Sequence, residues 1–416
     1  MNPVIVIPTY WEQNQAGMLV PGQYDHATNI SDQNPDLDRC LQSLEQVHGI
    51  IRIAVLVVCP LAQTEAVRLR VNQIVGKHPT LPVTIITNKE VSAIVDKIET
   101  IAPDLTGEVV SLRGYGAIRN VGLAIASIMG HDSVVFIDDD EIITTSDFLD
   151  RAMYGLGYET RSSLPILAKT GFFYDKDGSP LANTEGSRTC DKWWTKRLEF
   201  NEWMKRALTT TRISRSNYVC GGCMVLHARA YMHIPFDPYI TRGEDLDYLF
   251  NLRINGLDMW FDNRWNVHHY PPASPDSAPR FMQDVYRWYY ERAKIRETNN
   301  HIELHQVTAA SLMPYPGPWF SDQLDERIAK TSLARMLTTK EHLAYFKVWS
   351  RGRFDAKEYA QKYKRAYLRL QNFWSSIMNL LWRDEALLDM LTNPEVSRNT
   401  KYADEESSTK RGSSDD

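Results

Sequence analysis

Short apolar runs alternate with helical stretches along the first third of the chain. The runs hardly alternate between apolar and polar side chains, which is typical of a parallel sheet that helices cover on both faces. Between them, apolar residues recur every three or four positions and predict amphipathic helices. The apolar runs are 4–8, 51–58, 83–87, 109–112 and 133–137, and the predicted helices are 63–75, 91–101 and 117–128.

The last third of the chain has a helical pattern. From about residue 279 to residue 391 apolar side chains recur at helical spacing, as in Phe281, Val285 and Trp288, and we expect these stripes to pack into a core. Residues 397–416 are polar and predict a disordered tail. Between the first third and this helical region the pattern predicts strands at 164–173, 218–226 and 259–262 and a helix at 245–255.

Composition and charge exclude several classes of protein. A chain of 416 residues with 43% hydrophobic and 24% charged residues is long enough for two or three packed units. The net charge is −5 and no stripe of Lys and Arg is visible, so nucleic acid is not an expected partner. The first residues lack the pattern of a signal peptide, and no apolar run approaches the ~20 residues of a membrane span. We therefore expect a cytoplasmic protein without a transmembrane segment.

The cysteines predict neither a disulfide framework nor a zinc site. Their number is five, which is odd and low for a chain of this length. Cys220 and Cys223 form a single C-x-x-C, and no second pair or suitably spaced histidines follow closely. We expect a buried turn of small residues there.

Four acids directly follow the apolar run that ends at residue 137. Asp138, Asp139, Asp140 and Glu141 would lie at the carboxyl end of a strand, which is where open α/β sheets bind ligands. Adjacent carboxylates repel one another, and a divalent cation with a preference for oxygen ligands, Mg²⁺ or Mn²⁺, would relieve that repulsion. Alternation along an extended chain puts Asp138 and Asp140 on one side. The alternative is a solvated acidic turn before the next helix.

A second acidic motif and a histidine pair follow later in the chain. Glu244 and Asp245 open a predicted helix, where acids are favoured by the helix dipole, but a carboxylate there could also act as a general base that deprotonates a hydroxyl group. His268 and His269 follow the next strand and could complete the coordination of a metal ion or be structural.

The order of these motifs resembles the GT-A glycosyltransferases, and in particular their family 2, over about residues 4–270. Those enzymes begin with a Pro-x-Tyr-x-Glu type segment, start a helix with Arg-Asn-x-Gly, place D-x-D at a strand end and have Gly-rich, Glu-Asp and His motifs in that order. This chain reads Ile7-Pro8-Thr9-Tyr10-Trp11-Glu12, Arg119-Asn120-Val121-Gly122, Asp138-Asp139-Asp140, Gly221-Gly222, Gly243-Glu244-Asp245 and Val267-His268-His269.

The resemblance implies an α/β GT-A fold, with a Rossmann-like and mostly parallel sheet flanked by helices, and a helical C-terminal extension. It implies four segments: a nucleotide-sugar-binding half (1–145), an acceptor-binding and catalytic half (146–275), a helical region (276–395) and a disordered tail (396–416). The implied activity is metal-dependent transfer of a sugar from a nucleoside-diphosphate-sugar to an acceptor hydroxyl, with inversion at the anomeric carbon.

The resemblance also implies roles for individual residues. Asp245 would be the catalytic base, and Glu244 would help to orient the acceptor. Mn²⁺ or Mg²⁺ would be held by Asp138, Asp140 and one of the histidines, His268 or His269. The donor would be bound by Pro8, Thr9, Tyr10, Glu12, Arg119, Asp138 and Asp139.

Several alternatives stay open. After the second strand the chain reads Val58-Cys59-Pro60, without the acid that many family 2 enzymes have there, so the donor could be a UDP-sugar or a GDP-sugar. The long helical C-terminus also resembles mannosylglycerate synthase and related retaining enzymes. A nucleotidyltransferase is disfavoured because the loop 8–12 has neither glycine nor a basic residue. A non-catalytic sugar-binding or scaffold protein on the same fold is the alternative of another class.

The acceptor is not identified by any motif. Trp193, Trp194 and Trp203 could stack on a sugar, although we favour a core position for them. The C-terminal helices could shape the acceptor pocket or form a homodimer.

Overall fold

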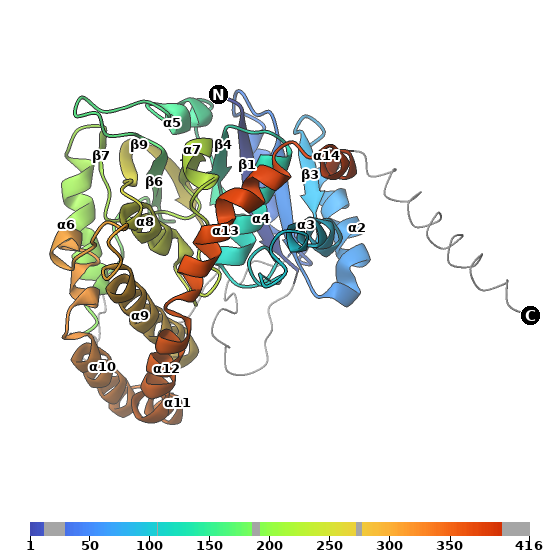
Figure 1. Cartoon of the computed structure of the whole chain (residues 1–416). Coiled ribbons are helices and arrows are strands. Elements are labelled where there is room, and N and C mark those ends of the chain that lie inside the picture. Colours follow the sequence, from blue (N-terminus) through green and yellow to red (C-terminus); the bar gives the residue numbers. More distant parts are fainter. Residues whose placement is uncertain (12–29, 106, 185–191, 272–276, 393–416) are drawn as a thin grey trace, which may run out of the picture.

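The computed structural model of this chain describes residues 1–11, 30–105, 107–184, 192–271 and 277–392. Its centre is a sheet in which the strands follow the order β3-β2-β1-β4-β8-β6-β9-β5, and β7 pairs with β9 (Figure 1). The strands are β1 (Pro3–Tyr10), β2 (Ile53–Val58), β3 (Val83–Ile86), β4 (Ser133–Phe136), β5 (Glu141–Ile142), β6 (Ala168–Tyr174), β7 (Ile213–Arg215), β8 (Met224–His227) and β9 (Trp260–His269).

One half of the sheet is parallel. Strand β1 pairs in parallel with β2 on one side and β4 on the other, and β2 pairs in parallel with β3. The carboxyl ends of β1, β2 and β4, at Tyr10, Val58 and Phe136, therefore meet at one edge of the sheet. Strand β8 joins β4 in the antiparallel direction, and β5 joins β9 in the same way, so the whole sheet is mixed. The predicted α/β sheet flanked by helices is confirmed.

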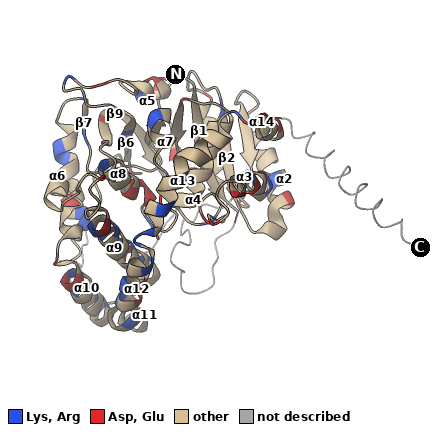
Figure 2. Ribbon diagram, viewed as in Figure 1, with Lys and Arg blue, Asp and Glu red and all other residues tan. Residues whose placement is uncertain are grey.

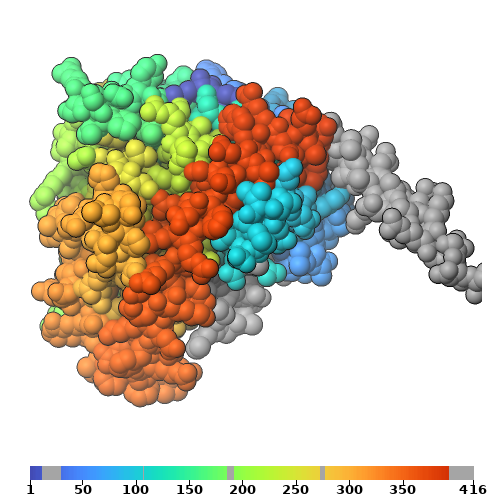
Figure 3. All heavy atoms as spheres, in the orientation of Figure 1, coloured from blue at the N-terminus to red at the C-terminus, as the bar shows by residue number. Residues whose placement is uncertain are grey.

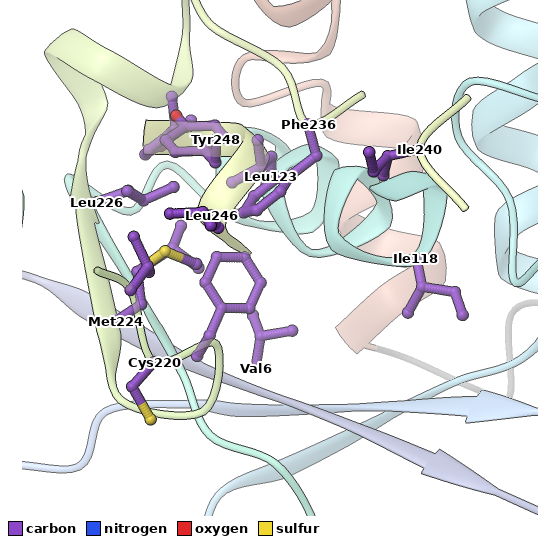
Figure 4. Close-up of a cluster of buried hydrophobic side chains, with 14 of the residues drawn as sticks. Val6, Ile118, Leu123, Cys220, Met224, Leu226, Phe236, Ile240, Leu246 and Tyr248 are labelled. Carbon is purple, nitrogen blue, oxygen red and sulfur yellow. The ribbon is translucent and has the colours of Figure 1, made fainter. Parts of the chain in front are cut away.

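Helix α4 (Gly116–Ile128) is buried along its whole length, because it lies between the sheet and the C-terminal helices. Gly122 makes this possible: a Cβ there would lie 2.8 Å from Cγ1 of Val6. Figure 4 shows Ile118 and Leu123 of α4 in one apolar cluster with Val6. The other helices of this region are α1 (Asp36–Leu44), α2 (Thr64–Val75), α3 (Asn88–Glu99), α5 (Phe148–Met153), α6 (Lys196–Leu208), α7 (Ala228–Tyr231) and α8 (Glu244–Ile254).

The C-terminal third is helical, as its apolar spacing predicts. Phe281, Val285 and Trp288 are at most 2% exposed, so this stripe does pack into the core. Among the described ranges we find no helical segment with the length and hydrophobicity of a bilayer span. The helices are α9 (Ala278–Thr298), α10 (Leu324–Thr338), α11 (His342–Lys347), α12 (Arg353–Tyr363), α13 (Ala366–Leu381) and α14 (Glu385–Thr392).

Helices α13 and α14 bring the end of the described chain back to the first half of the fold. Figure 1 shows α9 to α12 at one end of the molecule and α13 running back across it, and Figure 3 shows α13 and α14 (red) on the surface beside α3 (cyan). Trp374 Nε1 donates to the carbonyl of Tyr231 at 2.8 Å, and Ser127 Oγ donates to the carbonyl of Met378 at 2.8 Å. Asp384 forms an ion pair with Lys97 of α3 at 2.9 Å.

Four sequence predictions need correction. The run 109–112 is not a strand but a series of turns and bends, although Val109 and Val110 are buried. The predicted strand 218–226 begins only at Met224, because residues 220–223 form a turn in which the Cys223 amide donates to the Cys220 carbonyl at 3.0 Å. The strand predicted at 164–173 starts at Ala168. In these three cases buried apolar side chains belong to irregular backbone, and hydrophobicity alone does not distinguish this from a strand. The fourth is the strand predicted at 259–262, which continues to His269, so His268 and His269 are its last two residues and do not follow it.

The cysteine motif is a turn, as expected. Cys220 and Cys223 are both buried free thiols. Gly221 and Gly222 occupy the tip of the turn.

Candidate active site

The acids after β4 lie at the edge where the parallel strands end, and each makes a different contact. Asp138 Oδ1 accepts a hydrogen bond from Arg119 Nη2 at 2.8 Å. Asp139 Oδ2 accepts one from Thr9 Oγ1, at the end of β1, at 2.7 Å. Asp140 Oδ2 lies 3.3 Å from Nε2 of a histidine, His269. The acidic turn therefore connects three elements: α4, β1 and β9.

Arg119 joins the two acidic motifs. Its Nη2 binds Asp138, and its Nε donates to Glu244 Oε1 at 3.1 Å across a separation of 125 residues. The guanidinium also lies over the ring of Phe136, 5.1 Å from its centroid. Arg119 is 6% exposed, so the position of the charge is fixed by these contacts. The neighbouring Asn120 is structural, because its side chain binds the backbone of Val109 and Phe236.

The two glycines before β8 let the backbone approach both acidic motifs. A Cβ on Gly221 would lie 3.0 Å from Arg119 Nη2 and 3.4 Å from Cβ of Asp245. A Cβ on Gly222 would lie 2.1 Å from Oε2 of Glu141, which is too close for any residue other than glycine unless Glu141 moves. The Gly-Gly turn thus leaves room for Asp245 beside Arg119, and Glu244 is held by that same arginine.

Burial and mutual repulsion raise the pKa values of several of these acids. Burial, and then the negative charge of Asp140, hold the pKa of Asp139 well above its usual range. Burial and the charges of Asp138 and Asp140 do the same to the pKa of Glu141. Burial raises the pKa of Glu244 to about 7, against the opposing effect of Arg119. Ionised carboxylates are therefore unfavourable in this site, and a bound cation would stabilise them.

The donor atoms at Asp140 and His269 fit a divalent metal ion. Two ligands at right angles on an octahedral ion with bonds of about 2.1 Å lie about 3 Å apart, close to the 3.3 Å between Asp140 Oδ2 and His269 Nε2. Carboxylate oxygen and imidazole nitrogen suit Mn²⁺. Burial lowers the pKa of His269. The hydrogen bond to Asp140 and the charge of that carboxylate outweigh this effect, so the pKa of His269 is raised overall.

The other predicted ligands are placed differently. His268 lies beside the ring of Tyr174, with centroids 5.3 Å apart, while His269 lies against Phe173. Asp138 is bound to Arg119. Within the described ranges no three His, Cys, Asp or Glu side chains gather closely enough to hold an ion by themselves. The structure thus pairs one aspartate and one histidine, and a bound diphosphate or water would have to supply further ligands.

The residues predicted to bind the nucleotide lie at the end of β1. Pro8, Thr9 and Tyr10 are buried, and Thr9 binds Asp139. Glu12 lies outside the described residues. Among the tryptophans, Trp203 is 7% exposed and packs on Tyr218 and Phe261, which is a core position.

One residue that the motifs did not indicate is Arg287 of α9. Its guanidinium lies against the backbone of Gly243, where a Cβ would be 2.1 Å from Arg287 Cζ. Arg287 Nε donates to Glu291 Oε1 at 3.1 Å, and its Nη2 is buried without a hydrogen-bond partner among the described residues. The sequence did contain a signal for buried charges here, because Asp284, Arg287 and Glu291 lie within the apolar stripe of a helix. Charged residues are rarely buried in such a stripe unless they are paired.

Solved structures with detectable similarity have low identity to this chain. "Mannosyltransferase PcManGT from Pyrobaculum calidifontis in complex with GDP-Man and Mn2+" is 12% identical, with 94% of this chain and 86% of that chain covered and a TM-score of 0.44. S. aureus TarS is 14% identical, with 92% and 54% covered and a TM-score of 0.41. GalNAc-T7 with UDP, GalNAc and Mn2+ is 13% identical, with 73% and 52% covered and a TM-score of 0.41. No curated protein sequence matches the chain.

A family model gives the assignment. The model described as "Glycosyltransferase like family 2" matches residues 32–291, which is more than half of the chain. The match includes both acidic motifs, the Gly-Gly turn and the histidine pair. The chain therefore belongs to the glycosyltransferase family 2-like proteins and is a glycosyltransferase with an α/β fold of the GT-A type and a helical C-terminal region.

Proposed function

We propose that this glycosyltransferase moves a sugar from a nucleoside-diphosphate-sugar to an acceptor hydroxyl, with a divalent cation and with inversion. The observation that carries the proposal is Arg119, which binds Asp138 and Glu244 at once. The buried guanidinium of Arg119 therefore links the carboxyl end of β4 to the start of α8, which carries Asp245. A transferase has to bind its donor beside its acceptor, and the junction of the two acidic motifs provides such a place.

Each residue then has a chemical task. Pro8, Thr9 and Tyr10 would contact the nucleotide together with Glu12 and Asp139, and Arg119 would face the negative charge of the diphosphate. Asp140 and His269 would hold Mn²⁺ or Mg²⁺, which when bound neutralises charge on the leaving nucleoside diphosphate.

Asp245 would act as the base. Its Oδ1 accepts the amide hydrogen of Leu246 at 2.7 Å, which fixes the orientation of the carboxylate. In the proposed reaction Asp245 removes the proton of the acceptor hydroxyl while that oxygen attacks the anomeric carbon. The bond from that carbon to the diphosphate oxygen breaks on the opposite face.

The proposal is tested with a panel of uridine, guanosine and thymidine diphosphate sugars, each with Mn²⁺, Mg²⁺ or EDTA. We expect one donor to raise the melting temperature and to release its nucleoside diphosphate slowly, only with metal. Asp140→Ala should lose both responses, while Asp96→Ala, at an exposed aspartate of α3, should keep them. No response to any donor in any metal would contradict transferase chemistry and favour a scaffold protein.

The histidine pair gives a matched test of the metal site. His269→Ala should weaken Mn²⁺ binding about tenfold to a hundredfold, because it removes the imidazole beside Asp140. His268→Ala should change it less than about threefold, since that ring lies beside Tyr174 instead. Titration of Mn²⁺ followed by electron paramagnetic resonance measures both affinities. Equal losses in the two variants, or a larger loss in His268→Ala, would contradict this assignment.

A further inference from the structure

Helices α10, α11 and α12 lie at one end of the molecule and carry apolar side chains on their outer as well as their inner faces (Figure 1). On the inner faces, Ile328 of α10 and Tyr345 of α11 are fully buried, as amphipathic helices require. The outer apolar side chains are 39% to 79% exposed. They are Leu333 and Leu337 of α10, Leu343 and Phe346 of α11, and Phe354 of α12. We call these five residues the apolar tip.

The residues of the apolar tip are not scattered singly over the surface. Within α10, and again within α11, the two exposed residues are three or four positions apart and therefore share one face of their helix. Leu337 and Leu343 stand on either side of the short loop 339–341 that joins these two helices. Grouped exposed apolar side chains mark interaction surfaces more often than single ones do.

Aromatic contacts continue the apolar tip from α11 to α12. The ring of Phe346 lies 6.1 Å from that of Trp349, which belongs to the segment Val348–Gly352 between the two helices. The guanidinium of Arg353 lies over both Trp349 and Phe354, 5.7 Å and 4.9 Å from their ring centroids. The tip thus combines aromatic rings with an arginine whose aliphatic stem can cover them.

The same end of the molecule is basic. Residues 330–354 include six Lys and Arg but a single acid, Glu341, in a chain whose net charge is −5. Over the whole span of the three helices, 324–363, nine basic residues still outnumber five acids. Figure 2 shows Lys and Arg (blue) along these helices. Positive charge is therefore concentrated where the apolar side chains are exposed.

Two of these cations are available for a partner. Lys340, in the loop 339–341, and Lys347, at the end of α11, are exposed and form no ion pair within the described ranges. Others have acids one turn away: Lys330 pairs with Glu326, and Arg351 pairs with Asp355 at 3.3 Å. Exposed pairs of this kind contribute little to stability, so they do not fix the charges in place.

An anionic lipid surface matches both properties of this end. Its headgroup phosphates attract lysine and arginine, and its acyl chains lie directly below and accept leucine and aromatic side chains. A nucleic acid would pair with the cations but would leave the exposed leucines without an apolar layer. A second copy of this chain would cover the leucines but would bring like charges together.

We propose that the apolar tip docks this glycosyltransferase on the surface of an anionic lipid bilayer. Leu337 and Leu343 enter the region of the acyl chains, while Lys340 and Lys347 contact the headgroup phosphates. The contact is peripheral and requires no helix that spans the bilayer. It goes beyond the proposed function, since it needs neither a donor nor a metal ion.

Binding of the wild-type protein to lipid vesicles tests the proposal. Vesicles of phosphatidylcholine and phosphatidylglycerol in equal parts are compared with vesicles of phosphatidylcholine alone by co-sedimentation, without donor or metal. We expect the anionic vesicles to bind about tenfold more tightly or better. Binding should weaken as salt is raised, because the lysines are exposed and salt screens their charge. No binding to the anionic vesicles, or equal binding to both kinds, would overturn the proposal.

A pair of leucine substitutions tests the apolar part of the contact. Leu337→Ser combined with Leu343→Ser should weaken binding to anionic vesicles about tenfold or more. The two side chains are 68% and 79% exposed, so the melting temperature should stay unchanged. Leu69→Ser combined with Leu198→Ser, at leucines of α2 and α6 that are 65% and 56% exposed, is the matched control and should bind as the wild type does.

A pair of lysine substitutions tests the electrostatic part. Near an anionic surface each Lys or Arg strengthens binding about fivefold, so Lys340→Gln combined with Lys347→Gln should weaken it about thirtyfold. Arg161→Gln combined with Arg229→Gln, at exposed arginines outside the three helices, is the control and should leave vesicle binding unchanged.

The other occupants of this surface give different results. If binding depends on the lysine pair but not on the leucine pair, the surface takes an acidic macromolecule instead of a bilayer and the proposal is wrong. Self-association is followed by analytical ultracentrifugation. If it is lost in the leucine pair while vesicles do not bind the wild type, the apolar tip is an interface between copies of this chain, which also overturns the proposal.

Discussion

Asp245→Asn is expected to lower kcat for sugar transfer about a thousandfold while the affinity for the donor stays within about threefold. The amide keeps the shape of the side chain, and its oxygen can still accept the amide hydrogen of Leu246. It cannot take a proton from the acceptor hydroxyl. Because Arg119 and the acids after β4 are untouched, donor binding should persist, and the loss should lie in the chemical step.

The measurement is the rate of transfer under saturating donor, with donor affinity from the melting temperature. Asp96→Asn, on the exposed face of α3, is the matched control and should transfer at the wild-type rate. Nuclear magnetic resonance of the first product should show the anomeric configuration opposite to that of the donor. Retained configuration, or a loss below about tenfold in Asp245→Asn, would favour a retaining mechanism in which Asp245 is not a base.

Lys294→Ala is expected to reduce the free energy of unfolding by about 3–5 kcal/mol. Lys294 is 1% exposed and donates to Asp237 Oδ2 at 2.8 Å, Asp247 Oδ1 at 2.5 Å and Asn251 Oδ1 at 3.0 Å. Both aspartates are fully buried, so the substitution leaves two carboxylates without their cation. Burial already raises the pKa of Asp247 to about 6, against the opposing effect of Lys294.

Urea unfolding followed by circular dichroism measures the loss, with Lys347→Ala, at an exposed lysine of α11, as the control. The control should change the free energy of unfolding by less than about 0.5 kcal/mol. The lysine is on α9 while its partners are on α8 and in the loop before it, so the measurement also reports how tightly the C-terminal helices hold the transferase fold. A loss below about 1 kcal/mol would mean that the aspartates find other partners or are neutral.

Sequence patterns identified the parallel part of the fold because its elements are strongly apolar. Strand β1 and helix α4 match their predictions within two residues at each end. The acidic motifs could be recognised as a possible site since their strand-end and helix-start positions follow from local patterns. The resemblance assigned Arg119 to the donor, but its contact with both motifs was not predicted, because local spacing carries no information about a contact over 125 residues.

Other parts of the site depend on pairing between distant segments. Strand β5 has only two residues, yet it pairs Glu141 with His269 and so brings Asp140 to that histidine. No periodicity exists in two residues, so this pairing could not be predicted, and neither could the choice between His268 and His269. Arg287 was missed for a similar reason. It lies against Gly243, which directly precedes helix α8, and only tertiary packing brings these two residues together.

The return of α13 and α14 to α3 and α4 has a consequence for biosynthesis. Helix α4 lies at the centre of the first half of the fold, but part of its surface is covered only when α13, whose Met378 carbonyl accepts a hydrogen bond from Ser127, has left the ribosome. Until then the growing chain would expose that apolar surface for roughly tens of seconds, at elongation rates of about 5–20 residues per second. Folding of the first half should therefore be completed only after α13 has been synthesised, and chaperones that shield apolar surface should associate with the growing chain.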